Sequence, residues 1–163
     1  MSEKNLILAV DVGTTETKAV LVSPDGYIDS RQSSCCLCYP DKSCVEQSPE
    51  EISDAIYQSS RAVLAAHPDL IARLAGLVFT SQMQNTVPVD RGGKPLMNML
   101  SWMDERAACF TQEDMFRGWV KIEGYPVSKL LKFMRITGGM PGKTGKDTVC
   151  KLAWMKKNKP DLY

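Results

Sequence analysis

Hydrophobic and polar residues follow a strand pattern over the first part of the chain. A buried strand is predicted over residues 6–12, which are rich in aliphatic side chains and end at the turn Gly13-Thr14-Thr15. Two more strands are predicted over 17–22 and 27–34, separated by Ser23-Pro24-Asp25-Gly26. Because parallel neighbours need a crossover of a dozen residues or more, these short turns predict an antiparallel three-stranded meander.

The pattern changes to helical spacing over residues 49–66. Ser48 is predicted to be the N-cap, Pro49 suits the first turn, and Glu51 stands where it completes a capping box. Apolar residues at helical spacing predict a stripe that faces the core, made of Ile52, Ile56, Val63 and Ala66. A buried strand is then predicted over 74–80, and a strand that follows a helix favours a parallel crossover.

The second half of the chain has weaker patterns. Residues 86–90 and 95–100 predict a hairpin, and helices are predicted over 104–116, over 127–135 and from a cap at Asp147 to 158, the last with Val149, Leu152 and Ala153 inward. The element order predicts an α/β fold, a mixed sheet that starts with the antiparallel meander and is flanked by helices. This arrangement resembles the ribonuclease-H-like core.

Composition narrows the function classes. The chain has 163 residues, 44% hydrophobic, with 20 Lys+Arg against 19 Asp+Glu and a formal charge of +1. This balance is typical of a folded domain and gives no electrostatic reason to expect nucleic acid or an anionic membrane as partner. No apolar run is long enough for a signal segment or a membrane span, so we expect a cytoplasmic protein with reduced thiols.

Four of the six cysteines lie in SSCCLCYPDKSC, between Cys35 and Cys44. A zinc knot is one interpretation, but the first three cysteines are too crowded for the usual paired spacing and no histidine is near, so free thiols are favoured. The single histidine, His67, follows the predicted helix at 49–66 and is expected to be a surface residue that the helix dipole favours.

The residues Asp11 to Lys18, DVGTTETK, are the strongest chemical signal. An apolar strand delivers a carboxylate to its end, and a Gly-Thr-Thr turn then presents backbone N–H groups and hydroxyls beside it. Glycine lets such a turn approach phosphate oxygens closely, and a carboxylate can orient Mg²⁺ through water. An ordinary hairpin, whose Asp and Thr only satisfy turn hydrogen bonds, is the alternative.

This segment resembles the first phosphate-binding motif of the actin, Hsp70 and sugar-kinase superfamily. Further segments are similar, in order and spacing, to the FGGY family of carbohydrate kinases, with a xylulokinase-like branch nearest. They are VEQSPE from Val45, SQMQ from Ser81, VD from Val89, W-x-D-x-R from Trp102, TGG from Thr137 and KLAW from Lys151.

The resemblance implies phosphorylation of a sugar or polyol with ATP and Mg²⁺, a xylulose-like ketose being favoured. The resemblance implies that one set of residues binds the phosphates and Mg²⁺, with Asp11 toward the metal: Asp11, Gly13, Thr14, Thr15 and Lys18. It implies that a second set binds the sugar: Gln82, Met83, Gln84, Trp102, Asp104 and Arg106. The partners it implies are the small acceptor and the remainder of a kinase chain, and a homodimer stays open.

The chain departs from the family pattern where the sugar would lie. Ser81, Gln84 and Asn85 stand where the family has Gly, His and Gly. In the family, the general-base aspartate and the adenosine-binding loops follow the region that residues 1–163 match. We therefore interpret the chain as a partial N-terminal kinase domain, inactive by itself, with no catalytic base among its residues.

The sequence leaves three other interpretations. Gly142-Lys143-Thr144 nearly spells a Walker A loop, but Thr137 stands where the first glycine should be, and residues 129–136 are too charged for a buried strand. A nuclease would need several converging carboxylates, and only Asp11 is well placed. A non-catalytic ribonuclease-H-like module for interaction or regulation is the main alternative to the kinase.

Overall fold

The computed structural model describes residues 3–110, 117–140 and 142–162. The chain forms two compact units. Unit 1 comprises Met1–Cys38 and Gln47–Met83, and unit 2 comprises Tyr39–Glu46 and Gln84–Tyr163. Each unit has its own set of hydrogen-bonded elements.

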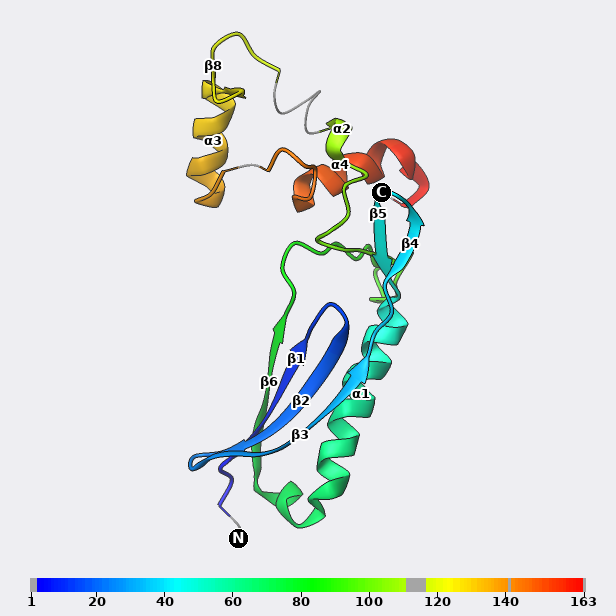
Figure 1. Ribbon diagram of the computed structural model, residues 1–163, viewed down its shortest axis with the longest axis vertical. Helices are drawn as coiled ribbons and strands as arrows, with labels where there is room; N and C mark the ends of the chain where they lie inside the picture. Colours follow the sequence, from blue (N-terminus) through cyan, green and yellow to red (C-terminus); the bar gives the residue numbers. More distant parts are fainter. Residues whose placement is uncertain (1–2, 111–116, 141, 163) are drawn as a thin grey trace. The chain divides into compact units, whose positions relative to one another are not determined.

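Unit 1 is built on a four-stranded mixed sheet. Its strands are β1 (Leu6–Val12), β2 (Glu16–Ser23), β3 (Gly26–Ser34) and β6 (Leu74–Ser81), in the order β3-β2-β1-β6 (Figure 1). β1 and β2 are antiparallel, as are β2 and β3, whereas β1 and β6 are parallel. The predicted meander and the parallel crossover are therefore confirmed.

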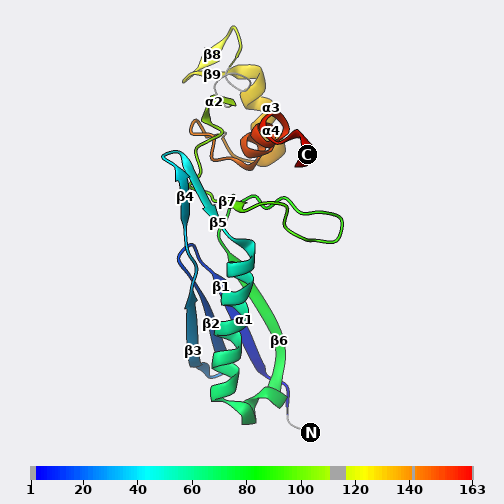
Figure 2. The ribbon, with the colours of Figure 1, turned by 90° about the vertical axis from the view of Figure 1, so that its right-hand side faces the viewer.

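Helix α1 (Pro49–Ala66) covers one face of this sheet, and a short 3-10 helix, η1 (Pro68–Arg73), leads from it to β6 (Figures 1 and 2). Alternate residues of β1 point toward α1, and the core they share with β2 and α1 consists of Leu6, Leu8, Val10, Val12, Ala19, Leu21 and Val63. Ile52 and Ile56 pack against this core as predicted, but Ala66 is exposed because it lies in the last turn of the helix.

The start of α1 shows half of the predicted capping box. The Ser48 hydroxyl accepts a hydrogen bond from the Glu51 backbone N–H at 3.2 Å. The Glu51 carboxylate does not return this bond; it accepts instead from the backbone N–H of Cys36 at 3.3 Å. The side chain thus ties the helix N-terminus to the segment after β3.

The other face of the sheet carries no helix among the described residues of unit 1. The prediction that residues 74–80 form a buried strand was therefore right about the strand and wrong about its burial: α1 packs on β2 and β3, and Leu77, Val78 and Phe79 of β6 are about half exposed. In β1 the alternation that buries Val10 leaves Asp11 exposed on the opposite face. This open face therefore carries the predicted metal-side carboxylate.

Unit 2 contains short elements. A small sheet has the order β4-β5-β7, and a second hairpin pairs β8 with β9. The strands are β4 (Cys38–Asp41), β5 (Cys44–Gln47), β7 (Met99–Leu100), β8 (Lys121–Ile122) and β9 (Tyr125–Pro126), and the helices are α2 (Ala108–Phe110), α3 (Val127–Thr137), α4 (Thr148–Asn158) and the 3-10 helix η3 (Pro160–Leu162). The hairpin predicted at 86–100 is present as two antiparallel bridges, Thr86 with Leu100 and Val89 with Pro95.

The helix predicted over 104–116 was wrong in its first turn, and residues 111–116 lie outside the described part of the chain. α2 begins only at Ala108, because the preceding backbone is engaged elsewhere. The Glu105 N–H donates to the carbonyl of Ser43 at 2.9 Å, and the Asp104 carboxylate is buried against β5. These contacts replace the helical hydrogen bonds that the pattern predicted.

The predicted inward face of α4 was also wrong in part. Val149 and Leu152 are 48% and 41% exposed, whereas Cys150, Lys151 and Met155 are buried. The helix is turned so that a lysine, which a hydropathy pattern places outside, faces inward and donates to backbone carbonyls. Asp147 does precede the helix, but its carboxylate makes no capping hydrogen bond to it.

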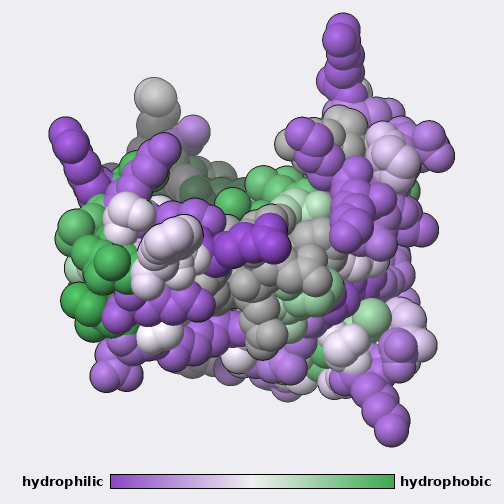
Figure 3. All heavy atoms as spheres, turned by 90° about the horizontal axis from the view of Figure 1, so that it is seen from above, coloured by the Kyte–Doolittle hydropathy of each residue, from purple (hydrophilic) through white to green (hydrophobic). Residues whose placement is uncertain are grey.

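No helix in the described part of the chain is both long enough and apolar enough to cross a membrane. The face drawn in Figure 3 carries many projecting hydrophilic side chains, with hydrophobic groups gathered in separate patches.

The core of unit 1 predicts the effect of a matched pair of truncations. Leu21→Ala removes a fully buried side chain and should lower the free energy of unfolding by about 2–5 kcal/mol, because a cavity remains. Leu77→Ala, in the same sheet but 56% exposed, should cost less than about 1 kcal/mol. Urea denaturation followed by circular dichroism measures both; equal losses would contradict this description of the core.

Candidate functional site

The residues predicted for the phosphate side lie together at the β1–β2 end of unit 1. Asp11 is directly opposite Lys18 on β2 and Thr80 on β6, and residues paired in this way share a face of the sheet. All three side chains are exposed. A carboxylate, an ammonium and a hydroxyl therefore form a polar row across the open face, near the carboxyl ends of β1 and β6.

The turn after this row requires glycine. The N–H of Gly13 donates to the Glu16 carbonyl at 3.0 Å, which closes the turn. A Cβ atom at Gly13 would lie 2.7 Å from that same backbone oxygen, a distance that real side chains do not adopt. The turn therefore requires glycine because its own backbone leaves no room for a side chain at this position, and the predicted approach of phosphate oxygens stays a prediction.

The side chain of Gln82 holds the turn in place. Its amide nitrogen donates to the Gly13 carbonyl at 3.1 Å and to Oε1 of Gln47 at 3.0 Å. Its own Oε1 accepts from the Thr14 hydroxyl at 3.2 Å, and its backbone N–H donates to the Val12 carbonyl. We call the side chains of Gln82 and Gln47 with the Gly13-Thr14 backbone the amide clamp.

Gln47 completes the amide clamp from the end of β5. Its Nε2 donates to the Thr14 carbonyl at 2.8 Å, and the residue is almost fully buried. Gln47 was not among the predicted site residues. The only signal for it was its position in the VEQSPE segment, and nothing in the sequence predicted that it would reach the turn.

The phosphate-side residues fit a magnesium–phosphate group chemically. The Asp11 carboxylate accepts no hydrogen bond from any residue in the described part of the chain, so its oxygens face solvent. Mg²⁺ in nucleotide sites is held by one or two carboxylates, water and the phosphates themselves, which this single exposed carboxylate can satisfy. Lys18 adds a positive charge beside it.

The residues predicted for the sugar side divide between the two units. Gln82 and Met83 belong to unit 1, and Gln84, Trp102, Asp104 and Arg106 belong to unit 2. Met83 is 78% exposed and Trp102 is 40% exposed, so both present surface to a ligand. The backbone N–H of Trp102 donates to Oδ1 of Asn85 at 2.7 Å. This hydrogen bond holds the backbone from which the indole extends.

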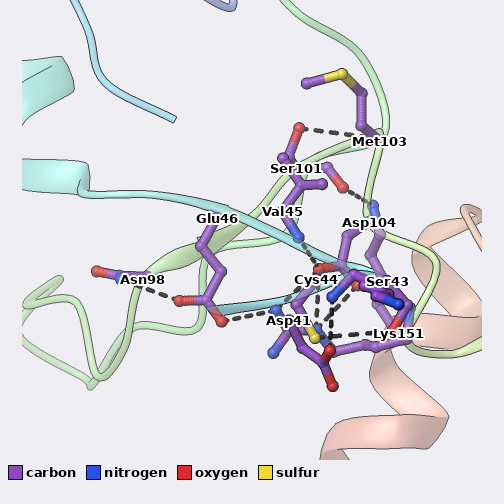
Figure 4. A network of polar contacts seen from close by, with 12 residues as sticks. Asp41, Ser43, Cys44, Val45, Glu46, Asn98, Ser101, Met103, Asp104 and Lys151 are labelled. Atoms are coloured by element: carbon purple, nitrogen blue, oxygen red, sulfur yellow. Dashed lines mark hydrogen bonds and ion pairs between the residues drawn. The ribbon is translucent and has the colours of Figure 1, made fainter. Parts of the chain in front are cut away.

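Asp104 and Arg106 form a largely buried ion-pair network with Glu46 instead of facing solvent. Figure 4 shows the side chains of Asp104 and Glu46 in this network. Arg106 Nε donates to both Asp104 oxygens at 2.9 Å, and its terminal nitrogen donates to Glu46 at 2.6 Å. Asp104 is fully buried and also accepts from the Val45 N–H at 2.7 Å. Although burial opposes it, hydrogen bonding to Asp104 and Glu46 raises the pKa of Arg106 above its ordinary value.

This network joins three segments of unit 2. Glu46 also accepts from Asn98 at 3.0 Å, as Figure 4 shows, and the Arg106 guanidinium lies 5.1 Å from the ring centroid of Trp154. The carboxylates of Asp104 and Glu46 therefore accept hydrogen bonds from other groups of the protein. The geometry gives Asp104 and Arg106 a positioning role, since their polar atoms are already engaged.

Lys151 is a second buried charge that the sequence did not single out as a site residue. Its side chain is fully buried, and its ammonium donates to the carbonyls of Gln84 at 2.8 Å and Ser101 at 2.7 Å. Burial lowers the pKa of Lys151 to about 8, against the opposing effect of Asp104. Gln84 has a φ of 61°, a left-handed conformation that is uncommon outside glycine, and this hydrogen bond supports it.

The remaining interpretations can be placed in the structure. Residues 127–137 form helix α3, not the strand that a Walker A loop follows, and Lys143 donates to the Glu123 carbonyl at 2.8 Å while lying over the Tyr125 ring. His67 ends α1 and shares a hydrogen bond with Asp29, which is the main reason that the pKa of Asp29 is lowered. None of the six cysteines, all described, is in a disulfide.

Removal of the Gln82 amide should loosen the turn. Gln82→Leu leaves the Gly13 carbonyl and the Thr14 hydroxyl without this partner and should lower unfolding free energy by about 1–3 kcal/mol. Amide hydrogen exchange at residues 13–16 should become faster. Gln58→Leu, which removes an exposed amide on α1, is the control; equal exchange rates in the two variants would contradict the clamp.

Ionisation of Lys151 predicts a pH dependence with a defined sign. The folded pKa of about 8 lies below the value of 10.5 for an ordinary lysine, so the unfolded chain holds this proton more tightly. Stability should therefore rise between pH 8 and 10.5, by at most about 3 kcal/mol from this group. Lys151→Met should remove that rise, whereas Lys132→Met should keep it. An identical pH profile in wild type and Lys151→Met would contradict this description.

Three comparisons extend these observations. The model for "FGGY family of carbohydrate kinases, N-terminal domain" matches residues 6–163. A gluconokinase from Bacillus licheniformis is 37% identical over 102 residues, which are 62% of this chain and 20% of that protein. The chain therefore spans about a fifth of that relative's length.

Solved structures agree in fold. A "xyloylose kinase" from Brucella ovis superposes with a TM-score of 0.81 at 23% identity, over 96% of this chain and 30% of that one. Plasmodium falciparum glycerol kinase, solved with ADP, gives 0.78 at 20% identity, over 99% and 30%. The α/β fold, with its mixed sheet and flanking helices, is the sugar-kinase fold of the actin and hexokinase group that the sequence predicted. With the family model matching nearly the whole length, the chain belongs to the FGGY family of carbohydrate kinases, of which it represents N-terminal domain sequence.

Proposed function

We propose that this chain is the phosphate-binding, N-terminal part of a kinase that uses ATP and Mg²⁺ to phosphorylate a hydroxyl group of a sugar or polyol. A xylulose-like ketose is the favoured acceptor. The family match supports the reaction class, and the observation that carries the proposal is the Asp11 carboxylate beside a turn that the amide clamp holds open.

The phosphate side follows from the chemistry of the turn. Asp11 would hold Mg²⁺ through water, and Lys18 would offset phosphate charge from the same face of the sheet. Gly13 allows the backbone of Thr14 and Thr15 to approach phosphate oxygens. Bound Mg²⁺ would supply charge neutralisation, which is the main requirement of phosphoryl transfer together with positioning.

The sugar side follows from exposure. Gln84, Met83 and Trp102 present side-chain surface, and an indole can cover the apolar face of a sugar while an amide bonds its hydroxyls. The polar groups of Gln82, Asp104 and Arg106 are engaged within the protein, so we assign them to positioning. Gln84 stands where the family has histidine, and its side-chain amide, like a neutral imidazole, can both donate and accept hydrogen bonds.

We further propose that the chain does not complete the reaction by itself. Asp104 is the acidic residue among those that the sequence predicted for the sugar side, and it is buried and paired, so its carboxylate is not available to accept a hydroxyl proton. A coupled assay of ADP release with xylulose, glycerol and gluconate tests this. Turnover by this chain at rates of about 1 s⁻¹ or more, typical of enzymes, would refute it.

Substitution of Asp11 tests the nucleotide side. Asp11→Asn should weaken binding of Mg·ATP about tenfold, the effect of losing one charged ligand, and should leave unfolding free energy within about 0.5 kcal/mol because the side chain is exposed. Isothermal titration calorimetry measures the affinity. Asp25→Asn, which removes the same charge from the exposed β2–β3 turn, is the control.

Two results would overturn the proposal. Equal Mg·ATP affinities in wild type and Asp11→Asn would show that the carboxylate does not face the nucleotide. Absence of both nucleotide and sugar binding would favour the non-catalytic ribonuclease-H-like module. The cytoplasmic location is a separate proposal, which cell fractionation would test.

A further inference from the structure

An open hollow of about 360 Å³ lies within unit 2, lined by residues of α3, by described residues between α3 and α4, and by the start of α4. Its lining includes the apolar residues Phe133, Met140 and Val149 and the polar residues Gln84, Thr137, Asp147 and Thr148. Apolar walls with a few polar groups are typical of small-molecule sites. Gln84, which lines it, is a predicted sugar-side residue, whereas Asp147 and Thr148 were assigned no role in binding.

Asp147 gives this hollow a negative charge. Its Oδ2 accepts one hydrogen bond, from the Gly142 N–H at 2.6 Å. A carboxylate offers about four acceptor positions, so others remain for a ligand that donates. The hydroxyl groups of a neutral sugar or polyol are donors, whereas the carboxylate of a sugar acid has no proton to donate at neutral pH and carries the same charge as Asp147.

No cation in the described lining compensates this charge. Three lysines lie near Asp147 in sequence, and their ammonium groups form contacts with other groups: Lys143 with the Glu123 carbonyl, Lys146 with the Glu105 carboxylate, and Lys151 with the carbonyls of Gln84 and Ser101. The charge of Lys151 also attracts the Asp147 carboxylate from outside the lining, so it offsets the negative charge of Asp147 only in part. The helix N-terminus of α4 contributes partial positive charge, which the adjacent Asp147 already offsets.

We propose that this hollow receives the acceptor and that Asp147 determines its specificity, so that the chain takes an uncharged sugar or polyol and rejects a sugar acid. This inference rests on the proposed kinase function and names its substrate class. If it holds, the acceptor of this chain differs in charge from the sugar acid for which the similar gluconokinase is named.

Titration of the 163-residue chain with D-xylulose and D-gluconate, followed by amide chemical shifts at 137, 139 and 149, tests the proposal. Xylulose should bind about tenfold more tightly or better, the discrimination expected for two like charges a few ångströms apart near a protein surface. Asp147→Asn, which keeps an acceptor for the Gly142 N–H, should reduce the difference below about threefold, chiefly by tightening gluconate binding. Asp161→Asn, away from the lining, should behave as wild type.

Each result supports or overturns the inference. Equal binding of both ligands, unchanged in Asp147→Asn, would overturn the specificity claim while leaving sugar binding, and thus the proposed function, in place. If neither ligand shifts the lining amides, the hollow is not the acceptor site, and Mg·ATP binding at Asp11 still reports separately on the kinase proposal.

A salt series keeps the test valid if Asp147→Asn fails to fold. Because ions screen like-charge repulsion, raising ionic strength from about 0.02 to 0.5 M should improve gluconate binding to the wild type a few-fold relative to xylulose. An unchanged ratio of affinities would overturn the role of Asp147.

Discussion

The structure of the candidate phosphate site depends on one partly buried amide. Gln82, at the end of β6, reaches the turn between β1 and β2 and binds both its carbonyl and its hydroxyl groups. The Gly13 N–H closes the turn by donating to the Glu16 carbonyl, but a backbone N–H that binds a ligand cannot also stabilise the turn. The amide clamp resolves this conflict, because Gln82 and Gln47 hold the turn through its carbonyls and the Thr14 hydroxyl. Burial of the clamp makes these hydrogen bonds costly to break.

A similar principle operates in unit 2, with charges instead of amides. Asp104 and Lys151 are fully buried, and each joins segments that are far apart in sequence. Asp104 links β5 to the segment before α2, and Lys151 links α4 to Gln84 and Ser101. A buried charge is strongly destabilising when one partner is lost, so such groups define one arrangement of the loops that carry Gln84 and Trp102.

Sequence patterns predicted unit 1 well because its elements are long and regular. Runs of aliphatic residues predicted β1 and β6, although β6 is exposed and not buried, and the bounds of α1 follow from Ser48, Pro49 and its apolar spacing. Unit 2 was harder because its elements are short and buried polar contacts determine them. Glu105 and Asp104 look like the start of a helix, but their tertiary partners override local propensity. Lys151 reverses the inward face of α4, since hydropathy does not indicate a lysine whose ammonium meets two carbonyls.

The motif predicted that Asp11 and Gly13 lie together at the end of β1, and the structure confirms this position, whereas the polar partners of Asp104 and Arg106 could not be predicted from spacing. The central claim is that the β1–β2 turn receives the phosphates of a nucleotide. The most direct measurement is paramagnetic broadening of amide signals by Mn²⁺·ATP in place of Mg²⁺·ATP, with Mn²⁺ alone as reference. This account predicts broadening centred on residues 11–18 that needs ATP. Broadening centred elsewhere, or the same broadening with Mn²⁺ alone, would contradict it.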